Sequence, residues 1–252
     1  LYQGEFGNET AKGEGYLRYG NGDEFWGLLD GWNRIYGYHH WMQYQTWYDG
    51  EFNENLPEGY GVLQYGDGGR TEGFFKKNMR EGFAKYWYPS GAFFQGHWKK
   101  NTQHGQGEYY YINRDWYSGH WKNGKRDGAG EYYYHDRGHK YVGEWQNGER
   151  SGKGKLVYDL GDQIEATFEN GEVKPDAGNN LHVLHSGVYR GKVNSNKAPE
   201  GFGILYTRNG DIFEGEFVNG VKEGEGKLRQ RNGDTLEGMW KSGAFVHSSS
   251  ES

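Results

Sequence analysis

The sequence predicts an all-β fold, namely a single-layer, elongated antiparallel β-meander of about ten hairpin repeats of about 23 residues each. Three observations predict it. An aromatic-x-Gly-x-aromatic motif recurs at nearly constant spacing, its residues alternate with the period of a β-strand, and turn dipeptides separate the units.

The central glycine of this motif recurs in steps of 23–25 residues, apart from one repeat in which Ala166 replaces it. Its positions are Gly4, Gly27, Gly50, Gly73, Gly96, Gly119, Gly143, Gly191, Gly215 and Gly238. A Gly-x-Gly pair follows most of these glycines about nine residues later, for example Gly105 and Gly107. The regular spacing indicates a repeat array rather than a single irregular domain.

Each repeat is expected to be a hairpin of two strands. Alternation places Tyr117, Gly119 and Trp121 on one face of a strand. Asn-Gly pairs such as Asn123–Gly124 predict tight two-residue turns after such strands. Glycine weakens a strand, but it also leaves room for a neighbouring ring to lie flat across the backbone. The rings and the glycines therefore predict a buried layer that needs no second sheet.

Composition excludes several classes of protein. The 252 residues include 45 glycines, 22 tyrosines and 10 tryptophans but no cysteine, so disulfides and thiolate chemistry are excluded. No apolar run is long enough for a transmembrane helix. The net charge of −6 argues against binding of nucleic acid, which needs a basic surface.

The motif resembles the MORN repeat, whose units read Tyr-x-Gly-x-Trp-x-x-Gly followed by Gly-x-Gly. The resemblance runs from Tyr2 to about Trp240 and is most specific at Tyr117–Gly130 and Tyr141–Gly154. Two segments, "HGQGEYYYINRDWYSGHWKNG" (His104–Gly124) and "GHKYVGEWQNG" (Gly138–Gly148), are similar to the radial spoke head MORN proteins of motile cilia and flagella.

Departures from the repeat predict the organisation of the chain. A first block of repeats is expected over residues 1–170, an irregular joint or loop over 171–187, a second block over 188–245 and a disordered tail over 246–252. The repeat around Gly27 lacks its Gly-x-Gly pair and has a shifted Gly37 instead.

The aromatic residues are the candidates for partner binding. These rings are expected to form the core. Because a single layer cannot cover every ring, the aromatic face also predicts a groove for a partner. The candidates are Trp26, Trp32, Trp41, Trp47, Tyr117, Trp121, Tyr141 and Trp145. The candidate structural glycines are Gly4, Gly50, Gly96, Gly119, Gly143 and Gly215.

No catalytic residue, metal site or cofactor is predicted. The pairs His39–His40 and His182/His185 lack the spacing of zinc sites, and the Gly-x-Gly pairs do not precede a helix as nucleotide-binding loops do. The carboxylates near the C-terminus occupy the polar alternate positions of strands, as on a solvated face.

These features predict a non-enzymatic scaffold that holds protein partners in a large assembly. The resemblance implies an axonemal component of the radial spoke head, located in the cytoplasm and the cytoskeleton of a cilium or flagellum, with a homodimer as one option. Two alternatives remain. One is a membrane-associated adaptor, whose basic residues at Lys76–Lys77, Lys99–Lys100 and Lys122–Arg126 would contact anionic phospholipid. The other is the regulatory arm of a larger enzyme.

Overall fold

The computed structural model describes residues 1–176, 178 and 180–248, and most of them lie in strands or in the turns that join strands. Two short 3-10 turns, η1 (Met42–Tyr44) and η2 (His135–Arg137), interrupt the succession of strands. Within the described part of the chain, no helix has the length and apolar character needed to cross a membrane. The predicted all-β class is confirmed.

The chain forms two compact units, Leu1–Gly128 and Ala129–Ser252. The strands of the first unit are β1 (Tyr2–Gly7), β2 (Thr10–Arg18), β3 (Glu24–Asp30), β4 (Asn33–Trp41), β5 (Thr46–Asn53), β6 (Leu56–Gln64), β7 (Arg70–Lys76), β8 (Met79–Trp87), β9 (Phe93–Lys99), β10 (Thr102–Tyr110) and β11 (Trp116–Lys122). The boundary falls within β12 (Lys125–Tyr134). The strands of the second unit are β13 (His139–Gln146), β14 (Glu149–Tyr158), β15 (Gln163–Glu169), β16 (Glu172–Val173), β17 (Leu181–Leu184), β18 (Gly187–Val193), β19 (Pro199–Thr207), β20 (Ile212–Val218), β21 (Val221–Arg229), β22 (Thr235–Lys241) and β23 (Ala244–Ser248).

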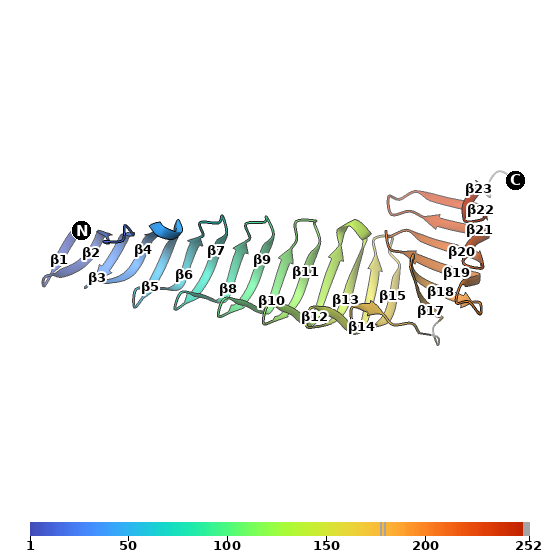
Figure 1. The fold of residues 1–252 in the computed structure, drawn as a ribbon, viewed down its shortest axis with the longest axis horizontal. Helices are drawn as coiled ribbons and strands as arrows, with labels where there is room; N and C mark the ends of the chain where they lie inside the picture. The colour runs from blue at the N-terminus through green and yellow to red at the C-terminus, as the bar shows by residue number, and fades with distance from the viewer. Residues whose placement is uncertain (177, 179, 249–252) are drawn as a thin grey trace. The chain divides into compact units, whose positions relative to one another are not determined.

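The strands follow one another in the sheets in the order of the sequence, as Figure 1 shows within each unit. Strands β1–β16 belong to one 16-stranded sheet and β17–β23 to a 7-stranded sheet. Consecutive strands pair antiparallel, for example β9 with β10 and β10 with β11. This order confirms the predicted antiparallel meander.

A row of glycines, interrupted only by Ala84, crosses the sheet of the first unit. Gly96 on β9 faces Gly107 on β10, which faces Gly119 on β11. The members of the row, in order, are Gly4, Gly15, Gly27, Gly37, Gly50, Gly61, Gly73, Ala84, Gly96, Gly107 and Gly119. The shifted Gly37 thus faces Gly27 and Gly50, and the irregular second repeat does not break the row. In the second unit, Gly143 faces Gly154, and Gly203 faces Gly191 and Gly215.

Aromatic rings over this row, together with the backbone of the facing strands, leave no room for a Cβ atom. A Cβ placed on Gly107 would lie 2.5 Å from Cζ of Phe94. At Gly4, Gly143 and Gly191 the nearest atom to such a Cβ is a tyrosine hydroxyl oxygen, at 2.4, 2.4 and 2.3 Å. At Gly50, Gly96 and Gly215 the nearest atom is Cα of the facing glycine, at 2.6, 2.4 and 2.6 Å. Gly119 shares the row through its pairing with Gly107. Because real Cβ atoms do not approach so closely, any side chain at these positions must displace a ring or the facing strand.

Hydrogen bonds hold the rings in place over the backbone. The indole N–H groups of Trp98 and Trp121 donate to the carbonyl oxygens of Ala84 and Gly107 at 3.0 and 3.1 Å. The hydroxyls of Tyr117 and Tyr141 donate to backbone carbonyls at 2.9 and 2.8 Å. These bonds satisfy the polar atoms of buried rings, so Tyr and Trp can fill a layer that is only one sheet deep.

The turns follow the predicted chemistry. Asn123 and Gly124 both have positive φ, 51° and 76°, as a two-residue loop of a tight hairpin requires. Gly105, the first glycine of its Gly-x-Gly pair, also has a positive φ of 72°, and the register of β9 with β10 shifts beside it. The first glycine of the pair therefore forms a bulge, and the second lies under a ring.

The sheet starting at β17 follows a short connection. The segment predicted as an irregular joint, 171–187, contains β16, β17 and an isolated bridge between Asp176 and Leu181, while residues 177 and 179 lie outside the described residues. Of the predicted tail, Val246 to Ser248 lie in β23, and residues 249–252 lie outside the described residues.

Candidate partner-binding surface

The two faces of the sheet differ in burial. On β11, Tyr117, Gly119 and Trp121 are buried, whereas Ser118 and His120 between them are not. We call the face with the glycine row the inner face and the opposite one the outer face. The alternation results from the two-residue period of the strand.

Four predicted partner-binding rings lie on the inner face within the core. Tyr117 and Tyr141 are fully buried, and Trp121 and Trp145 expose only 7% and 4% of their surface. Each tyrosine contacts the tryptophan four residues later edge to face, at ring-centroid distances of 5.2 and 5.3 Å. Their role in this fold is packing, and their predicted contact with a partner remains a prediction.

The four predicted tryptophans of the N-terminal region lie in three different places. Trp26 and Trp47 lie on the outer face, on β3 and β5. Trp41 lies on the inner face, where its ring stacks on His39 at 4.3 Å. Trp32 lies in the turn between β3 and β4, is 51% exposed and contacts Tyr2 edge to face. The structure therefore joins Trp26 with Trp47 and separates Trp32 and Trp41 from them.

Trp26 and Trp47 belong to a continuous row of rings across four strands. Tyr16 on β2 lies 5.0 Å from Trp26, Trp26 lies 5.6 Å from Tyr38 on β4, and Tyr38 lies 5.5 Å from Trp47. We call these four residues the outer aromatic row. Trp26 is 41% exposed. Rings in mutual contact on a solvent-facing sheet form the kind of apolar patch that partners bind.

Acidic groups border the outer aromatic row. The hydroxyl of Tyr16 donates to the carboxylate of Glu24 at 2.8 Å, and this hydrogen bond raises the pKa of Tyr16. Asp49 pairs in register with Tyr38 across β4 and β5. The pKa of Tyr38 is raised, first by burial and then by the charges of Asp49 and Glu24. The row thus combines apolar ring faces with tyrosine hydroxyls that stay protonated at neutral pH.

Further rings are exposed on the outer face of the first unit, and none was predicted as a site. Tyr60 and Phe74 contact each other edge to face at 5.4 Å and are 45% and 49% exposed. Phe83 is 44% exposed and lies 6.0 Å from the ring of His97. These residues occupy variable positions of the repeat, so the motif does not select them. The period-two alternation was the available signal, because it assigns these positions to the outer face.

Cations cover several rings of the inner face, and none of these cations was predicted from the sequence. Arg80 lies 3.9 Å from the ring centroid of Trp98, and Lys222 lies 4.6 Å from that of Phe213. Arg150 lies 5.1 Å from the ring of Phe168. All three are the second residue after a hairpin turn, which is the signal that could have found them. Contacts of this kind contribute about 0.5–2 kcal/mol and reduce the exposed ring surface of the inner face.

Two histidines are buried among rings. His39 lies between Tyr19 and Trp41, and His139 lies between Tyr134 and Tyr158 at 5.1 and 5.2 Å. Burial is the main cause that lowers the pKa of His39 to about 3 and that of His139 to about 4. Both therefore stay neutral at pH 7. Among the described residues, no group of three or more His, Cys, Asp or Glu side chains could hold a metal ion.

The depressed pKa of His139 predicts loss of stability in acid. The unfolded chain binds a proton at this histidine near pH 6.5, but the folded chain does not until about pH 4. The free energy of unfolding therefore falls as the pH decreases through this window, by about 1.4 kcal/mol per pH unit. His139→Phe retains an aromatic ring that binds no proton. Between pH 6.5 and 5, its free energy of unfolding in urea titrations should therefore fall by about 2 kcal/mol less than that of wild type. Equal losses in both proteins would contradict this.

Solved structures with detectable similarity differ strongly from this chain. A SAS-4 (dCPAP) TCP domain in complex with a proline-rich motif of Ana2 (dSTIL), from Drosophila melanogaster, is 16% identical with a TM-score of 0.27, covering 71% of this chain and 88% of its own. A streptogramin B lyase is 10% identical with a TM-score of 0.17, covering 98% of this chain and 90% of its own. A virginiamycin B lyase from Staphylococcus aureus is 8% identical with a TM-score of 0.15, covering 90% of this chain and 83% of its own. Scores this low carry no inference about function.

The comparison with models of protein families gives a clear match. No curated protein matches the chain. The model of the MORN repeat matches six segments, at residues 48–70, 72–93, 94–116, 117–139, 141–162 and 213–235. Together they cover more than half of the sequence and follow the spacing of the glycine row. The chain therefore belongs to the MORN repeat family.

Proposed function

We propose that this chain is a non-enzymatic scaffold that holds protein partners in a large assembly, and that it binds one of them through the outer aromatic row. The MORN repeat is in general a non-enzymatic interaction module. The observation that carries the proposal is the contact of Tyr16, Trp26, Tyr38 and Trp47 across four strands on a solvent-facing surface. The glycine row holds these strands in register, so the rings keep a fixed spacing without a partner.

The assembly that we propose is the axoneme of a motile cilium, with the radial spoke head as the specific setting. The support is the resemblance of His104–Gly124 and Gly138–Gly148 to the radial spoke head MORN proteins. Many modest contacts along a repeat array would supply avidity at a fixed spacing, which suits a structural component of a large complex.

Proximity labelling in ciliated cells tests this function. The chain is expected to label axonemal proteins. The double variant Trp26→Ser/Tyr38→Ser is expected to reduce that labelling about tenfold or more, because it removes central aromatic anchors. Phe202→Ser is the matched control, because Phe202 is 64% exposed on β19 but lies outside the row.

Two outcomes would contradict the proposal. Labelling of membrane proteins alone, with salt-sensitive binding to anionic vesicles, would favour the membrane-adaptor alternative. Unchanged labelling by the double variant, with a far-UV circular dichroism spectrum like that of wild type, would exclude the outer aromatic row as the partner site.

A further inference from the structure

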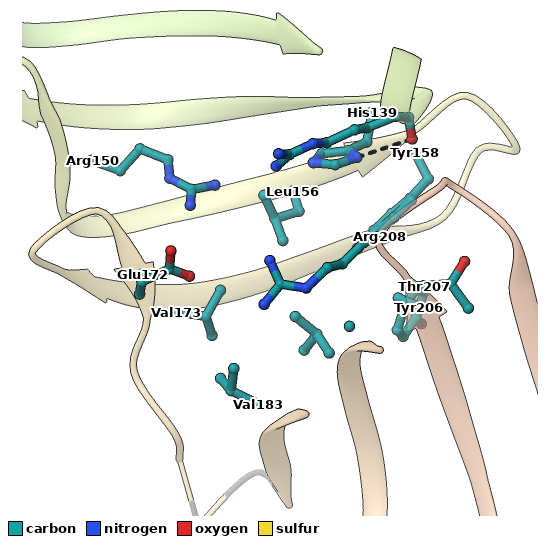
Figure 2. A pocket seen from close by; sticks show the side chains of 13 residues that line it. His139, Arg150, Leu156, Tyr158, Glu172, Val173, Val183, Tyr206, Thr207 and Arg208 are labelled. Atoms are coloured by element: carbon teal, nitrogen blue, oxygen red, sulfur yellow. Dashed lines mark hydrogen bonds between the residues drawn. The ribbon is translucent and has the colours of Figure 1, made fainter. Parts of the chain in front are cut away.

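A small cavity within the second unit is lined by three arginines from three separate elements. Arg137 lies in η2, Arg150 on β14 and Arg208 in the turn after β19. The cavity has a volume of about 60 Å³. Figure 2 shows Arg150 and Arg208 extending from different elements toward the space between Leu156 and Val173. Segments far apart in the sequence thus bring positive charges to one place.

These arginines have no acidic partner in the described part of the chain, where no carboxylate oxygen lies within 4.0 Å of their guanidinium nitrogens. Arg229 differs, because it forms an ion pair with Asp162 at 2.7 Å. Glu172 is the acidic residue of the lining, so three cations and one anion face the cavity. The net charge of the lining is therefore positive.

Backbone carbonyls hold two of the three guanidinium groups. Arg150 donates through Nε to the carbonyl oxygen of Gly171 at 2.7 Å, and Arg208 donates through Nε to that of His185 at 2.8 Å. A carbonyl oxygen orients a guanidinium group without neutralising its charge. The Nη groups of Arg208 make no hydrogen bond within the described structure and are available as donors.

Apart from Glu172, the walls between the arginines are apolar or neutral. Leu156, Val173 and Val188 line the cavity and are buried, and His139 is held neutral by burial, as described above. Arg150 is half-buried beside these walls, so water screens its charge less than that of the exposed Arg137 and Arg208. The neutral imidazole adds no further charge.

We propose that this cavity binds a phosphate group. Guanidinium groups donate paired hydrogen bonds that match the oxygens of phosphate, and they bind it better than lysine ammonium groups do. The small volume suits the phosphate group alone, so the rest of a phosphorylated ligand lies outside the cavity. This site is separate from the outer aromatic row, which belongs to the first unit, and does not depend on the proposed scaffold role.

Isothermal titration calorimetry of the full chain with inorganic phosphate, at constant ionic strength, tests the site. Binding is expected, and Arg208→Ala should weaken it about tenfold or more, because Arg208 is exposed and contributes unpaired donors. Arg18→Ala is the control, since it removes one exposed arginine of the first unit and should leave the affinity unchanged. Arg137→Ala provides a second variant with the same expected loss.

A parallel experiment distinguishes the source of the phosphate group. Sedimentation with vesicles of phosphatidylcholine, with and without phosphatidylinositol phosphate, measures binding of a lipid headgroup. If Arg208→Ala weakens binding in the calorimetry, the ligand is free phosphate; if it weakens binding to the vesicles, the ligand is a lipid headgroup. Either result supports the site. The proposal is overturned if wild type binds neither probe, or if Arg208→Ala and Arg137→Ala bind as wild type does.

Discussion

Gly96→Ala is expected to destabilise the chain by more than about 3 kcal/mol, which exceeds the usual cost of a single methyl group in a packed core. A Cβ on Gly96 would lie 2.4 Å from Cα of Gly107 and 2.6 Å from the carbonyl oxygen of Gln106. Both atoms belong to the backbone of β10, which the ladder with β9 holds in place. Gly96 also has a φ of 157°, which alanine rarely adopts. The two strands must therefore separate locally to admit the methyl group.

Urea denaturation followed by tryptophan fluorescence measures this loss, with Gly20→Ala as the matched control. Gly20 is an exposed turn residue without a positive φ, and no atom lies within 4 Å of the place where its Cβ would be. Its substitution should change the free energy of unfolding by no more than about 0.5 kcal/mol. Similar midpoints for Gly96→Ala and Gly20→Ala would show that the glycine row is not required for the close pairing of strands.

Phe94→Ala is expected to cost about 3–5 kcal/mol, because it removes a fully buried ring from the core. Phe94 contacts Trp98 and Trp121 edge to face at 5.0 and 5.3 Å. Its ring also lies over Gly107, where a Cβ would be 2.5 Å from Cζ. The destabilisation should therefore combine the loss of ring contacts with a cavity over the glycine row.

A double-mutant cycle separates the two kinds of glycine contact. Gly107→Ala overlaps the Phe94 ring, so its cost should fall by about 1–3 kcal/mol when Phe94→Ala is already present. Gly96→Ala overlaps backbone atoms, so its cost should remain mostly the same in the Phe94→Ala background. If the costs of Gly107→Ala and Phe94→Ala are additive, the position of the Phe94 ring does not require the space that glycine leaves at position 107.

The regular parts of the fold could be predicted from the sequence because they are local. Alternation along one strand places Tyr117 and Trp121 on the same face, and Asn123–Gly124 determines the turn that follows. Even the irregular second repeat obeys this rule, since Gly37 lies opposite Gly27 and Gly50. Each of these features needs only one hairpin and its neighbour.

The candidate sites could be predicted only in part. Tryptophan content indicated the region of Trp26 and Trp47, but it grouped them with Trp41 on the opposite face and with Trp32 in a turn. Tyr16 and Tyr38, which join the row, stood out less because tyrosine occurs throughout the repeats. Assigning the row requires the cross-strand register, in which Tyr16 faces Trp26 and Trp26 faces Tyr38.

The repeat period, the hairpin turns and the pairing of ring with glycine follow from the sequence alone, because each depends on residues at most about one repeat apart. Other features arise only when distant segments pack together. The arginines of the cavity are separated by up to 71 positions, from Arg137 to Arg208, and share no motif. Strands β13–β16 and β17–β19 of the second unit belong to two different sheets. No periodic pattern in the sequence specifies which of their side chains meet, because this depends on how the two sheets pack against each other.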